Sequence, residues 1–306
     1  MDFPILDDAT RLARLAPPTG PVEMVLDTDT YNEIDDQFAV VYSLLSPERL
    51  SVRALYAAPF HNNRSTGPGD GMIKSYDEIG RLLERMGRPA DGFAFRGAER
   101  WMAGPDDAVA SDAAADLVAR GMADRDGPLY VVAIGAITNV ASAILLEPRL
   151  VDRIVVVWLA GQPHYWHTAG DFNLSQDLHA ARVILQSGVP FVHVPCKHVA
   201  QLLRTTVGEL RTDGVDAGPI GKFLFQRFFD YHEDHFAWAK EIWDLAPVAW
   251  LVNPAWLPST IVHSPVLTDQ HSWSADPFGH LMRVALDCNR NAIFADVFTK
   301  LNGAST

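Results

Sequence analysis

Short apolar runs alternate along this chain with longer segments in which apolar residues recur every three to four positions. Several short runs, such as LYVVAIG and RIVVVWLAG, are apolar at nearly every position. That pattern is typical of parallel strands buried on both faces, because a half-exposed strand alternates apolar and polar residues. The predicted strands are Val22–Leu26, Val52–Ala57, Phe93–Gly97, Leu129–Ile134, Arg153–Leu159 and Phe191–Val194, with a last strand in HLMRVALD.

The longer segments have helical period, and each ends at glycine, proline or a polar break. The predicted helices are Asp35–Leu45, Met72–Met86, Asp112–Met122, Thr138–Leu146, Gln176–Ser187 and a terminal helix around Ala292–Lys300. Such alternation predicts an α/β fold, an open doubly wound and mostly parallel sheet with helices on both faces. In such sheets ligands bind beyond the carboxyl ends of the strands.

The chain shows no internal repeat and no low-complexity linker, so we expect residues 1–306 to form a single domain. Region 215–250 is rich in aromatic residues and histidine and is helical in period, and we expect it to form a lid or a pocket wall. At helical spacing, Tyr231, His232, His235 and Trp238 would share part of one face. Two interpretations remain open: an aromatic core stripe with surface histidines, or a lid over a substrate.

Charge and composition exclude several classes of function. Asp and Glu number 38 against 25 Lys and Arg, for a net charge of −13, so the chain repels phosphate backbones and anionic membrane surfaces. No uninterrupted apolar run reaches the ~18 residues of a membrane span, and the opening MDFPILDDATRL is acidic where a signal peptide is basic. Two cysteines, Cys196 and Cys288, exclude a disulfide framework. We expect a cytoplasmic protein without nucleic-acid or membrane partners.

The stretch VEMVLDTDTYNEIDDQF carries the candidate chemistry. Its apolar strand runs into Asp27 and Asp29, and a short loop leads to Asp35 and Asp36 at the start of a helix. Brought together, these carboxylates would repel one another unless a cation holds them. All-oxygen ligands favour a hard cation such as Ca²⁺ or Mg²⁺. The ordinary alternative is that these acids cap the helix and lie in a solvated loop.

In this motif the chain resembles the inosine-uridine nucleoside hydrolase family, whose members open with a strand that leads into Asp-x-Asp followed by Asp-Asp. Three later segments resemble family motifs in the same order: IGAITNVASAI, GDFNLSQDLHAARVIL and IWDLAPVAWLV. The resemblance covers about residues 22–300. It implies the nucleoside hydrolase fold and Ca²⁺-dependent hydrolysis of the N-glycosidic bond of ribonucleosides, which releases base and ribose for purine or pyrimidine salvage. Homo-oligomers, dimers or tetramers, are common among such relatives.

The resemblance also implies roles for individual residues. Asp29 would be the base that activates a metal-bound water, with Asp27 and Asn32 behind it. The implied calcium ligands are Asp29, Asp36, Asp244 and the main-chain carbonyl of Thr138. Asp35, Asp171 and Asn173 would hold the ribose hydroxyls. A cation and carboxylates suit this chemistry, because the transition state resembles an oxocarbenium ion and needs negative charge nearby.

The chain departs from the family pattern at three places. The loop between Asp29 and Asp35 is two residues longer than usual. Trp243 stands where many members have a histidine that protonates the leaving base, so His232 or His235 would have to supply that proton. Asp171 replaces a glutamate that is longer by one methylene, and Trp166 lies in a stretch where it could stack on a base.

Two rival functions remain. Asp27-Thr28-Asp29-Thr30 also fits the opening of haloacid-dehalogenase phosphotransferases, in which Asp27 would be the nucleophile and Asp29 the acid or base, with Mg²⁺ and a later lysine such as Lys197. No convincing late acidic pair follows a strand, as that family requires. The second rival is a relative that binds a ribonucleoside without turning it over.

Overall fold

A computed structural model describes residues 3–304 and has an eight-stranded sheet at its centre. The strand order is β3-β2-β1-β4-β5-β6-β12-β9. Every neighbouring pair is parallel except β12 and β9, which are antiparallel. The strands are β1 (Val22–Thr28), β2 (Leu50–Ala57), β3 (Ala94–Arg96), β4 (Leu129–Ala133), β5 (Ile154–Leu159), β6 (Phe191–Val194), β9 (Ser259–His263) and β12 (Leu281–Ala285). The predicted open, mostly parallel sheet is confirmed.

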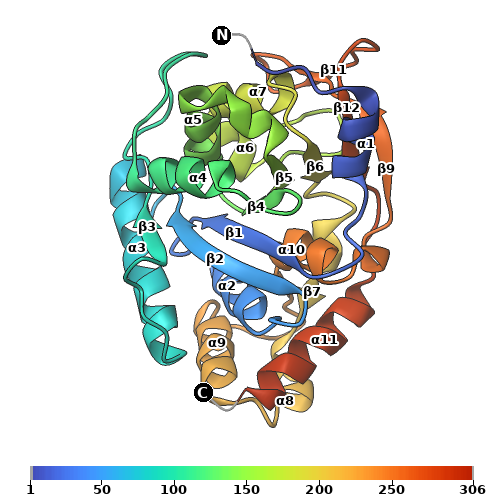
Figure 1. The fold of residues 1–306 in the computed structure, drawn as a ribbon. Helices are drawn as coiled ribbons and strands as arrows, with labels where there is room; N and C mark the ends of the chain where they lie inside the picture. Colours follow the sequence, from blue (N-terminus) through green and yellow to red (C-terminus); the bar gives the residue numbers. More distant parts are fainter. Residues whose placement is uncertain (1–2, 305–306) are drawn as a thin grey trace.

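Helices cover both faces of this sheet (Figure 1). One face carries α4 (Asp112–Met122), α5 (Thr138–Leu146), α6 (Phe172–Gln176) and α7 (Leu178–Gln186). The other carries α2 (Asp35–Leu44), α8 (Val207–Asp213), α9 (Pro219–Asp230), α10 (Leu245–Val252) and α11 (Arg290–Gly303). The remaining elements are α1 (Asp8–Leu15), α3 (Pro68–Arg85), η1 (Pro148–Asp152), η2 (Ala200–Leu202), η3 (Pro254–Trp256) and the short strands β7 (Arg204–Thr205), β8 (Lys240–Glu241), β10 (Val266–Leu267) and β11 (Trp273–Ser274).

Strict alternation along the central strands divides the core into two apolar layers. In β1, Met24 and Leu26 belong to the layer under α2 and α10, whereas Val25 belongs to the layer under α5. Successive side chains of a strand point to opposite faces, so strands apolar at every position feed both layers. The same alternation decides on which face the polar residues at the end of β1 lie.

The strand order places a crevice at the end of β1. From β1 the chain moves outward through β2 and β3 and then returns to β4 on the other side of β1. At such a reversal the loops after the two central strands diverge, and the space between them is the usual ligand site of an open α/β sheet. Asp29 follows β1, and Gly135 follows β4, at this position.

Two predicted helices are wrong in detail. The predicted helix 176–187 is divided at Asp177, whose carboxylate caps α7 by accepting the Ala180 N–H. Region 215–250 is not continuously helical, because α9 ends at Asp230 and no helix covers residues 231–239. Within that segment Ala237 has a φ of 53°, which a right-handed helix excludes. The helical face expected for the four aromatic and histidine side chains is therefore not formed.

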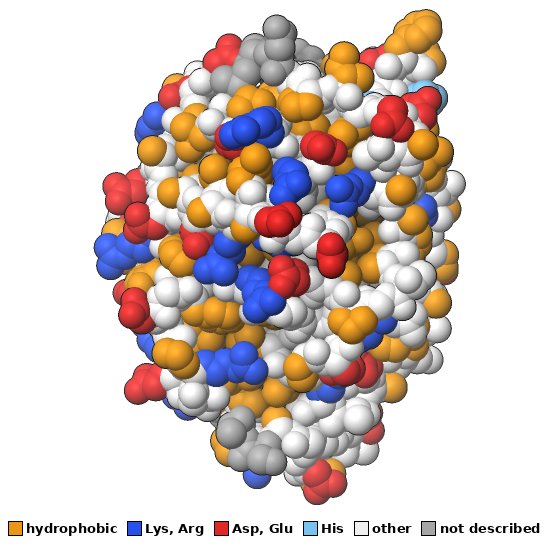
Figure 2. Space-filling view, in the orientation of Figure 1, with side chains coloured by type: hydrophobic (Ala, Val, Ile, Leu, Met, Phe, Trp, Pro, Cys, Tyr) orange, Lys and Arg blue, Asp and Glu red, His pale blue; other side chains and the backbone are white. Residues whose placement is uncertain are grey.

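The face shown in Figure 2 carries Lys and Arg side chains interspersed with Asp and Glu rather than a basic patch. Among the described residues, Glu23 forms ion pairs with Arg53 and Arg125. Such a face offers no continuous attraction to a polyanion. Within residues 3–304, no helix has both the length and the apolar character that crossing a bilayer demands. Both cysteines are free thiols.

Gly97 packs closely against the end of β2 and against Asn139, where no side chain would fit. A Cβ there would lie 2.0 Å from the Ala57 carbonyl oxygen and 2.5 Å from Asn139 Nδ2. Because the backbone oxygen cannot yield, we expect Gly97→Ala to cost about 1–3 kcal/mol of unfolding free energy. Gly80→Ala is the matched control: nothing lies within 4 Å of the added methyl group in α3, so helix propensity should stabilise the protein by about 0.5–1 kcal/mol. Urea unfolding measures both, and an unchanged midpoint for Gly97→Ala would contradict this packing.

Candidate active site

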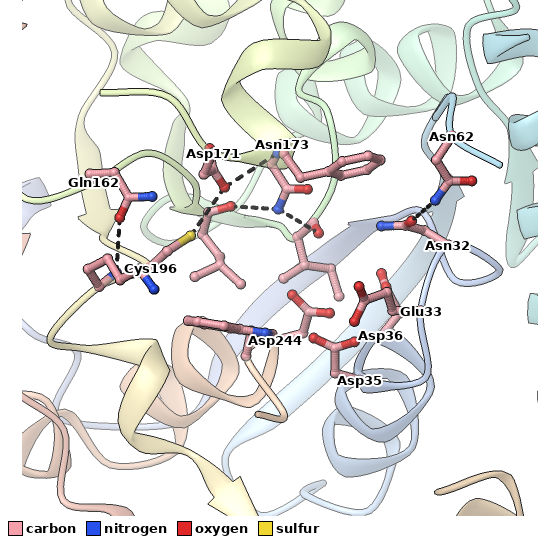
Figure 3. A pocket seen from close by; sticks show the side chains of 15 residues that line it. Asn32, Glu33, Asp35, Asp36, Asn62, Gln162, Asp171, Asn173, Cys196 and Asp244 are labelled. Atoms are coloured by element: carbon pink, nitrogen blue, oxygen red, sulfur yellow. Dashed lines mark hydrogen bonds between the residues drawn. The ribbon is translucent and has the colours of Figure 1, made fainter. Parts of the chain in front are cut away.

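A cavity of about 330 Å³ opens at the carboxyl ends of the central strands (Figure 3). Its volume lies at the lower end of the range for small-molecule sites, about 300–1,000 Å³. Loops after β1, β4, β5 and β6 contribute to it, together with the start of α10. The lining residues are Asn32, Glu33, Asp35, Asp36, Asn62, Ile134, Leu159, Gln162, Asp171, Phe172, Asn173, Cys196, Lys197, Trp243 and Asp244.

The end of β1 sends adjacent polar side chains to opposite faces of the sheet. Asp27 points toward α5, where its Oδ1 accepts a hydrogen bond of 2.7 Å from Asn139 Nδ2. Thr28 points toward α2, and its hydroxyl donates to Asp36 Oδ1 at 2.6 Å. Strand alternation therefore determines which helix each residue serves. Each bond links the end of β1 to the start of a helix.

Three carboxylates from two distant parts of the chain converge beside the cavity. Asp35 and Asp36 lie in the first turn of α2, and Asp244 lies immediately before α10. Each offers an oxygen within 4.8 Å of the others, and all three residues are buried. No side chain caps α2 or α10, so the ordinary interpretation of these acids as helix caps does not hold.

Asp29 lies close to this group and is fully buried. Neither of its carboxylate oxygens has a hydrogen-bond partner, and the same is true of Asp35 Oδ1. Gly135 leaves room for Asp29, since a Cβ on that glycine would lie 2.9 Å from Asp29 Oδ1. Buried carboxylate oxygens without donors are costly, because desolvation is not offset by any bond.

Burial and mutual repulsion oppose ionisation throughout the cluster. Burial, followed by the Asp35 charge, raises the pKa of Asp36 to about 8. Burial raises the pKa of Asp27 to about 7, although the bond from Asn139 acts in the opposite direction. Burial and the neighbouring carboxylates raise the pKa of Asp29 and of Asp244 well above the usual range. A divalent cation would reverse this effect by favouring the ionised forms.

The donor set fits a hard divalent cation. The group formed by Asp35, Asp36 and Asp244 consists of carboxylates and contains no histidine or cysteine, and oxygen ligation is what Ca²⁺ and Mg²⁺ prefer. The partnerless oxygens of Asp29 are available beside them. This group differs from the ligand set that the family resemblance implies. It includes Asp35, which was assigned to the ribose hydroxyls, and it does not include Asp29, which was assigned to the metal.

One buried lysine supplies part of the missing positive charge. Lys240 forms an ion pair with Glu33, and its Nζ is 3.8 Å from Asp35 Oδ1. These carboxylates outweigh the burial of Lys240, so that the pKa of its ammonium is raised. Glu33 belongs to the lengthened loop after β1. The pair therefore ties that loop to the strand that precedes Asp244.

The opposite wall of the cavity is built from the loop before α6. Asn173 donates both amide hydrogens, to the Ile134 carbonyl at 3.0 Å and to the Leu159 carbonyl at 2.9 Å. This fixes its side chain and leaves Oδ1 as an acceptor at the cavity. Asp171 caps α6 through the Leu174 N–H and also accepts the Gly161 N–H.

The predicted site residues do not all meet at the cavity. Among the described residues, the cavity lining includes Asn32, Asp35, Asp36, Asp171, Asn173, Trp243 and Asp244 but does not include Asp27, Asp29, Thr138, Trp166, His232 or His235. The two histidines pack against Trp238, with ring centroids at 5.3 and 5.8 Å. Trp166 packs instead against His198. Thr138 is buried, and its hydroxyl donates to Asp177.

Sequence reasoning missed Gln162, Asn62 and Lys240 as residues at the site, and it named Lys197 only for the rival phosphotransferase. Lys197 lies three residues after the end of β6, and Gln162 lies three residues after the end of β5. The rule that ligands bind beyond the carboxyl ends of parallel strands would have selected both. Lys240 had no such signal, because it lies in the two-residue strand β8, which is not part of the central sheet.

Comparisons with known proteins agree with this geometry. The family model described as inosine-uridine preferring nucleoside hydrolase matches residues 24–295. The pyrimidine-specific ribonucleoside hydrolase RihA of Klebsiella pneumoniae (strain 342) is 28% identical over 256 residues, which are 76% of this chain and 79% of the relative.

Among solved structures, the plant nucleoside hydrolase PpNRh1 superposes with a TM-score of 0.73 at 20% identity, over 92% of this chain and 99% of that one. The purine-preferring ribonucleoside hydrolase from Gardnerella vaginalis gives a TM-score of 0.71 at 19% identity, again over 92% and 99%. These likenesses show a shared fold.

The raised pKa values predict how the chelator-treated protein responds to pH. Folding raises the pKa of Asp36 from 3.8 to about 8 and that of Asp27 to about 7. The folded chain thus binds these protons more tightly than the unfolded chain, and this stabilisation is lost as pH rises from about 4 to 8. We expect the Tm to fall across that window in the presence of chelator, and saturating Ca²⁺ to remove most of the fall.

Asp36→Asn provides the control for this experiment. Because an amide removes one buried charge, we expect the variant to lose less stability between pH 5 and 8 than the wild-type protein does with chelator. It should also gain less from Ca²⁺. A wild-type Tm that stays level or rises with pH in chelator would contradict the charged cluster.

Proposed function

This chain belongs to the inosine-uridine preferring nucleoside hydrolase family, and we propose that it hydrolyses the N-glycosidic bond of ribonucleosides with the help of Ca²⁺. Water adds at C1′ of the ribose, the bond from C1′ to the base nitrogen breaks, and the products are free base and ribose. Family membership favours this hydrolase over the phosphotransferase that Asp27 and Asp29 also suggested.

One observation carries the proposal: carboxylates from the β1 loop and from position 244 converge at a nucleoside-sized cavity with buried oxygens that lack donors. Negative charge of this kind stabilises a transition state in which the sugar carries positive charge. A fully hydrated acidic surface would not serve, since water screens the charges.

Asp29 is the residue we assign to proton removal. Its two oxygens are buried and have no donor within residues 3–304, so one of them is free to accept the proton of the attacking water. Because Gly135 has no side chain, the Asp29 carboxylate packs directly against its backbone, and Asp27 lies two residues earlier, in β1. When bound by Asp36 and Asp244, with Asp29, Asp35 or the Thr138 carbonyl beside them, a divalent cation would polarise the attacking water and the sugar hydroxyls.

Asn173 and Asp35 are the residues we assign to the ribose. The Asn173 amide is fixed by two carbonyls, so its free oxygen can accept from a sugar hydroxyl without rearrangement. Asp35 has one oxygen without a donor, at the side of the cavity where Lys240 lies. Together these acceptors would bind the 2′- and 3′-hydroxyls, which lie on the same face of the ribose ring.

The leaving group would depart without a proton from histidine. Among the described residues no histidine lines the cavity, and Trp243 stands beside Asp244 instead. Indole nitrogen is a donor that does not give up its proton in this pH range. Substrates with good leaving groups should therefore react fastest.

Replacing Asp29 tests the proton acceptor. We expect Asp29→Asn to lower kcat by about 10²–10⁴-fold, because the amide keeps the shape of the side chain and cannot accept the proton. Asp91→Asn, at an exposed position, is the matched control and should leave kcat unchanged. Activity of Asp29→Asn within threefold of wild type on any cleaved nucleoside would refute the assigned role.

The missing histidine predicts a dependence on the leaving group. We expect p-nitrophenyl riboside to be hydrolysed with a much larger kcat than inosine, because p-nitrophenolate needs no protonation. Steady-state assays with Ca²⁺ on both substrates measure the ratio. Equal kcat values for the two would indicate that another acid reaches the base.

A further inference from the structure

This inference rests on the proposed hydrolysis of ribonucleosides and concerns the substituent at C5′ of the substrate's ribose. The two ends of the cavity differ in their polar groups, as Figure 3 shows: Gln162 and Cys196 lie toward one end, and Asn32 and Asn62 toward the other. The carboxylate group and Asn173 lie between them. The ends therefore contact different parts of a bound nucleoside.

At the first end, every acceptor position of Asp171 is occupied by a donor from the chain. Its Oδ1 accepts the Gly161 N–H at 2.7 Å and the Leu174 N–H at 3.0 Å. Its Oδ2 accepts the Cys196 thiol at 3.1 Å and, more weakly, the Asn173 N–H at 3.4 Å. A carboxylate has about four lone-pair sites. Asp171 thus has nothing left with which to accept from a sugar hydroxyl.

Gln162 is likewise short of acceptors. Its Oε1 accepts the Lys197 main-chain N–H at 3.2 Å, and its Nε2 donates one hydrogen to the Gly170 carbonyl at 3.2 Å. One amide hydrogen remains unused, on a side chain that is buried and lines the cavity. That hydrogen is a donor offered to whatever occupies this end.

Lys197 supplies the strongest donor at this end. It lines the cavity, and within residues 3–304 no hydrogen bond, ion pair or ring contact engages its ammonium group. Burial and the carboxylates of Asp171 and Asp244 raise the pKa of the Cys196 thiol, whereas the Lys197 charge acts in the opposite direction. The ammonium therefore acts on the same end of the cavity as Cys196. This end presents the Lys197 ammonium and one Gln162 amide hydrogen as donors, whereas Gln162 Oε1 keeps one lone pair as an acceptor.

The second end suits a nucleobase. Asn62 Nδ2 donates to Asn32 Oδ1 at 2.7 Å, which leaves further amide hydrogens of both residues for a partner. Lys240 forms an ion pair with Glu33 on this side. The Asn32 and Asn62 amides match the polar edge of a base. With the base at this end, C5′ of the ribose points toward Lys197.

From these contacts we propose that the enzyme takes ribonucleosides with an anionic substituent at C5′, namely ribonucleoside 5′-monophosphates. Phosphate is an acceptor-only group, and Lys197 with the spare Gln162 hydrogen forms the complementary donor pair. A plain 5′-hydroxyl could donate to the remaining lone pair of Gln162 Oε1, but as a neutral group it gains less from the Lys197 charge than a phosphate does. Hydrolysis would break the bond from C1′ to the base and form a bond from C1′ to the water oxygen, releasing base and ribose 5-phosphate.

Kinetics of paired substrates with the Ca²⁺-loaded protein test the proposal. We expect kcat/KM for UMP or IMP to exceed that for uridine or inosine, and Lys197→Met to lower that ratio by about 10–100-fold, as loss of a charge-assisted hydrogen bond does. Lys197→Arg should retain most of the preference. Lys222→Met, on the exposed side of α9, is the control and should change neither rate.

Binding gives a second readout that is independent of turnover. Calorimetry should detect ribose 5-phosphate binding more tightly than ribose, with the difference lost in Lys197→Met and kept in Lys222→Met. Inorganic phosphate alone should compete weakly with ribose 5-phosphate. The anionic group that Lys197 binds could instead be a carboxylate on the base. Orotidine, a nucleoside whose base carries a carboxylate, is therefore assayed beside uridine and UMP.

The outcomes separate this proposal from the proposed function. Nucleosides cleaved as fast as their 5′-phosphates, with Lys197→Met leaving the ratio unchanged, would overturn the phosphate preference and leave nucleoside hydrolysis intact. Preference for orotidine over uridine without preference for UMP would overturn it also. If no nucleoside or nucleotide is cleaved, the proposed function fails, and tight binding of ribose 5-phosphate through Lys197 would still support the site.

Discussion

Negative charge that is buried at the end of β1 is the constraint on which this structure depends. Asp27, Asp29, Asp35, Asp36 and Asp244 are all buried, and several of their oxygens have no donor. Taking even one carboxylate out of water costs several kcal/mol unless a partner compensates for it. The chain itself supplies Asn139, Thr28 and Lys240, which is one positive charge against five acids. The remaining charge requires protons or a cation, and a divalent cation fits because Asp35, Asp36 and Asp244 offer carboxylate oxygens as ligands.

The fold makes this concentration of charge possible by holding each acid on a rigid element. Asp27 is part of a strand that pairs with β2 and β4 on both sides. Asp36 is fixed by Thr28 at the start of α2, and Asp244 starts α10, which packs against α2. A network of this kind resists the outward movement by which repelling side chains would otherwise relax. Catalysis benefits, because groups that are already in place need no reorganisation during the reaction.

Much of this could be predicted from the sequence. Runs of apolar residues identified the central strands, and the Asp-x-Asp motif at the end of the first strand identified the site. Both are local features of the sequence, so they can be recognised without the fold. Trp166, His232 and His235 were placed at the pocket on helical spacing and proximity in sequence. No helix covers residues 231–239 of the structure, and those rings pack against Trp238 or His198.

Other features required three dimensions. The pairing of Lys240 with Glu33 joins residues 207 positions apart, and no local pattern indicates it. The full occupation of Asp171 depends on donors from four separate residues, among them Cys196 after a different strand. Such satisfaction of hydrogen bonds is a property of packing rather than of composition. The sequence identified Asp171 as a polar residue at the site, and only the structure shows which of its neighbours it binds.

The most direct test of the central claim is a crystal structure of the protein grown with Ca²⁺ and measured for anomalous scattering. We predict one anomalous peak per chain at the carboxyl end of β1, in contact with carboxylate oxygens of both Asp36 and Asp244. A peak that contacts only the β1 loop and lies out of reach of Asp244, or a fully loaded crystal without a peak at this site, would contradict the account.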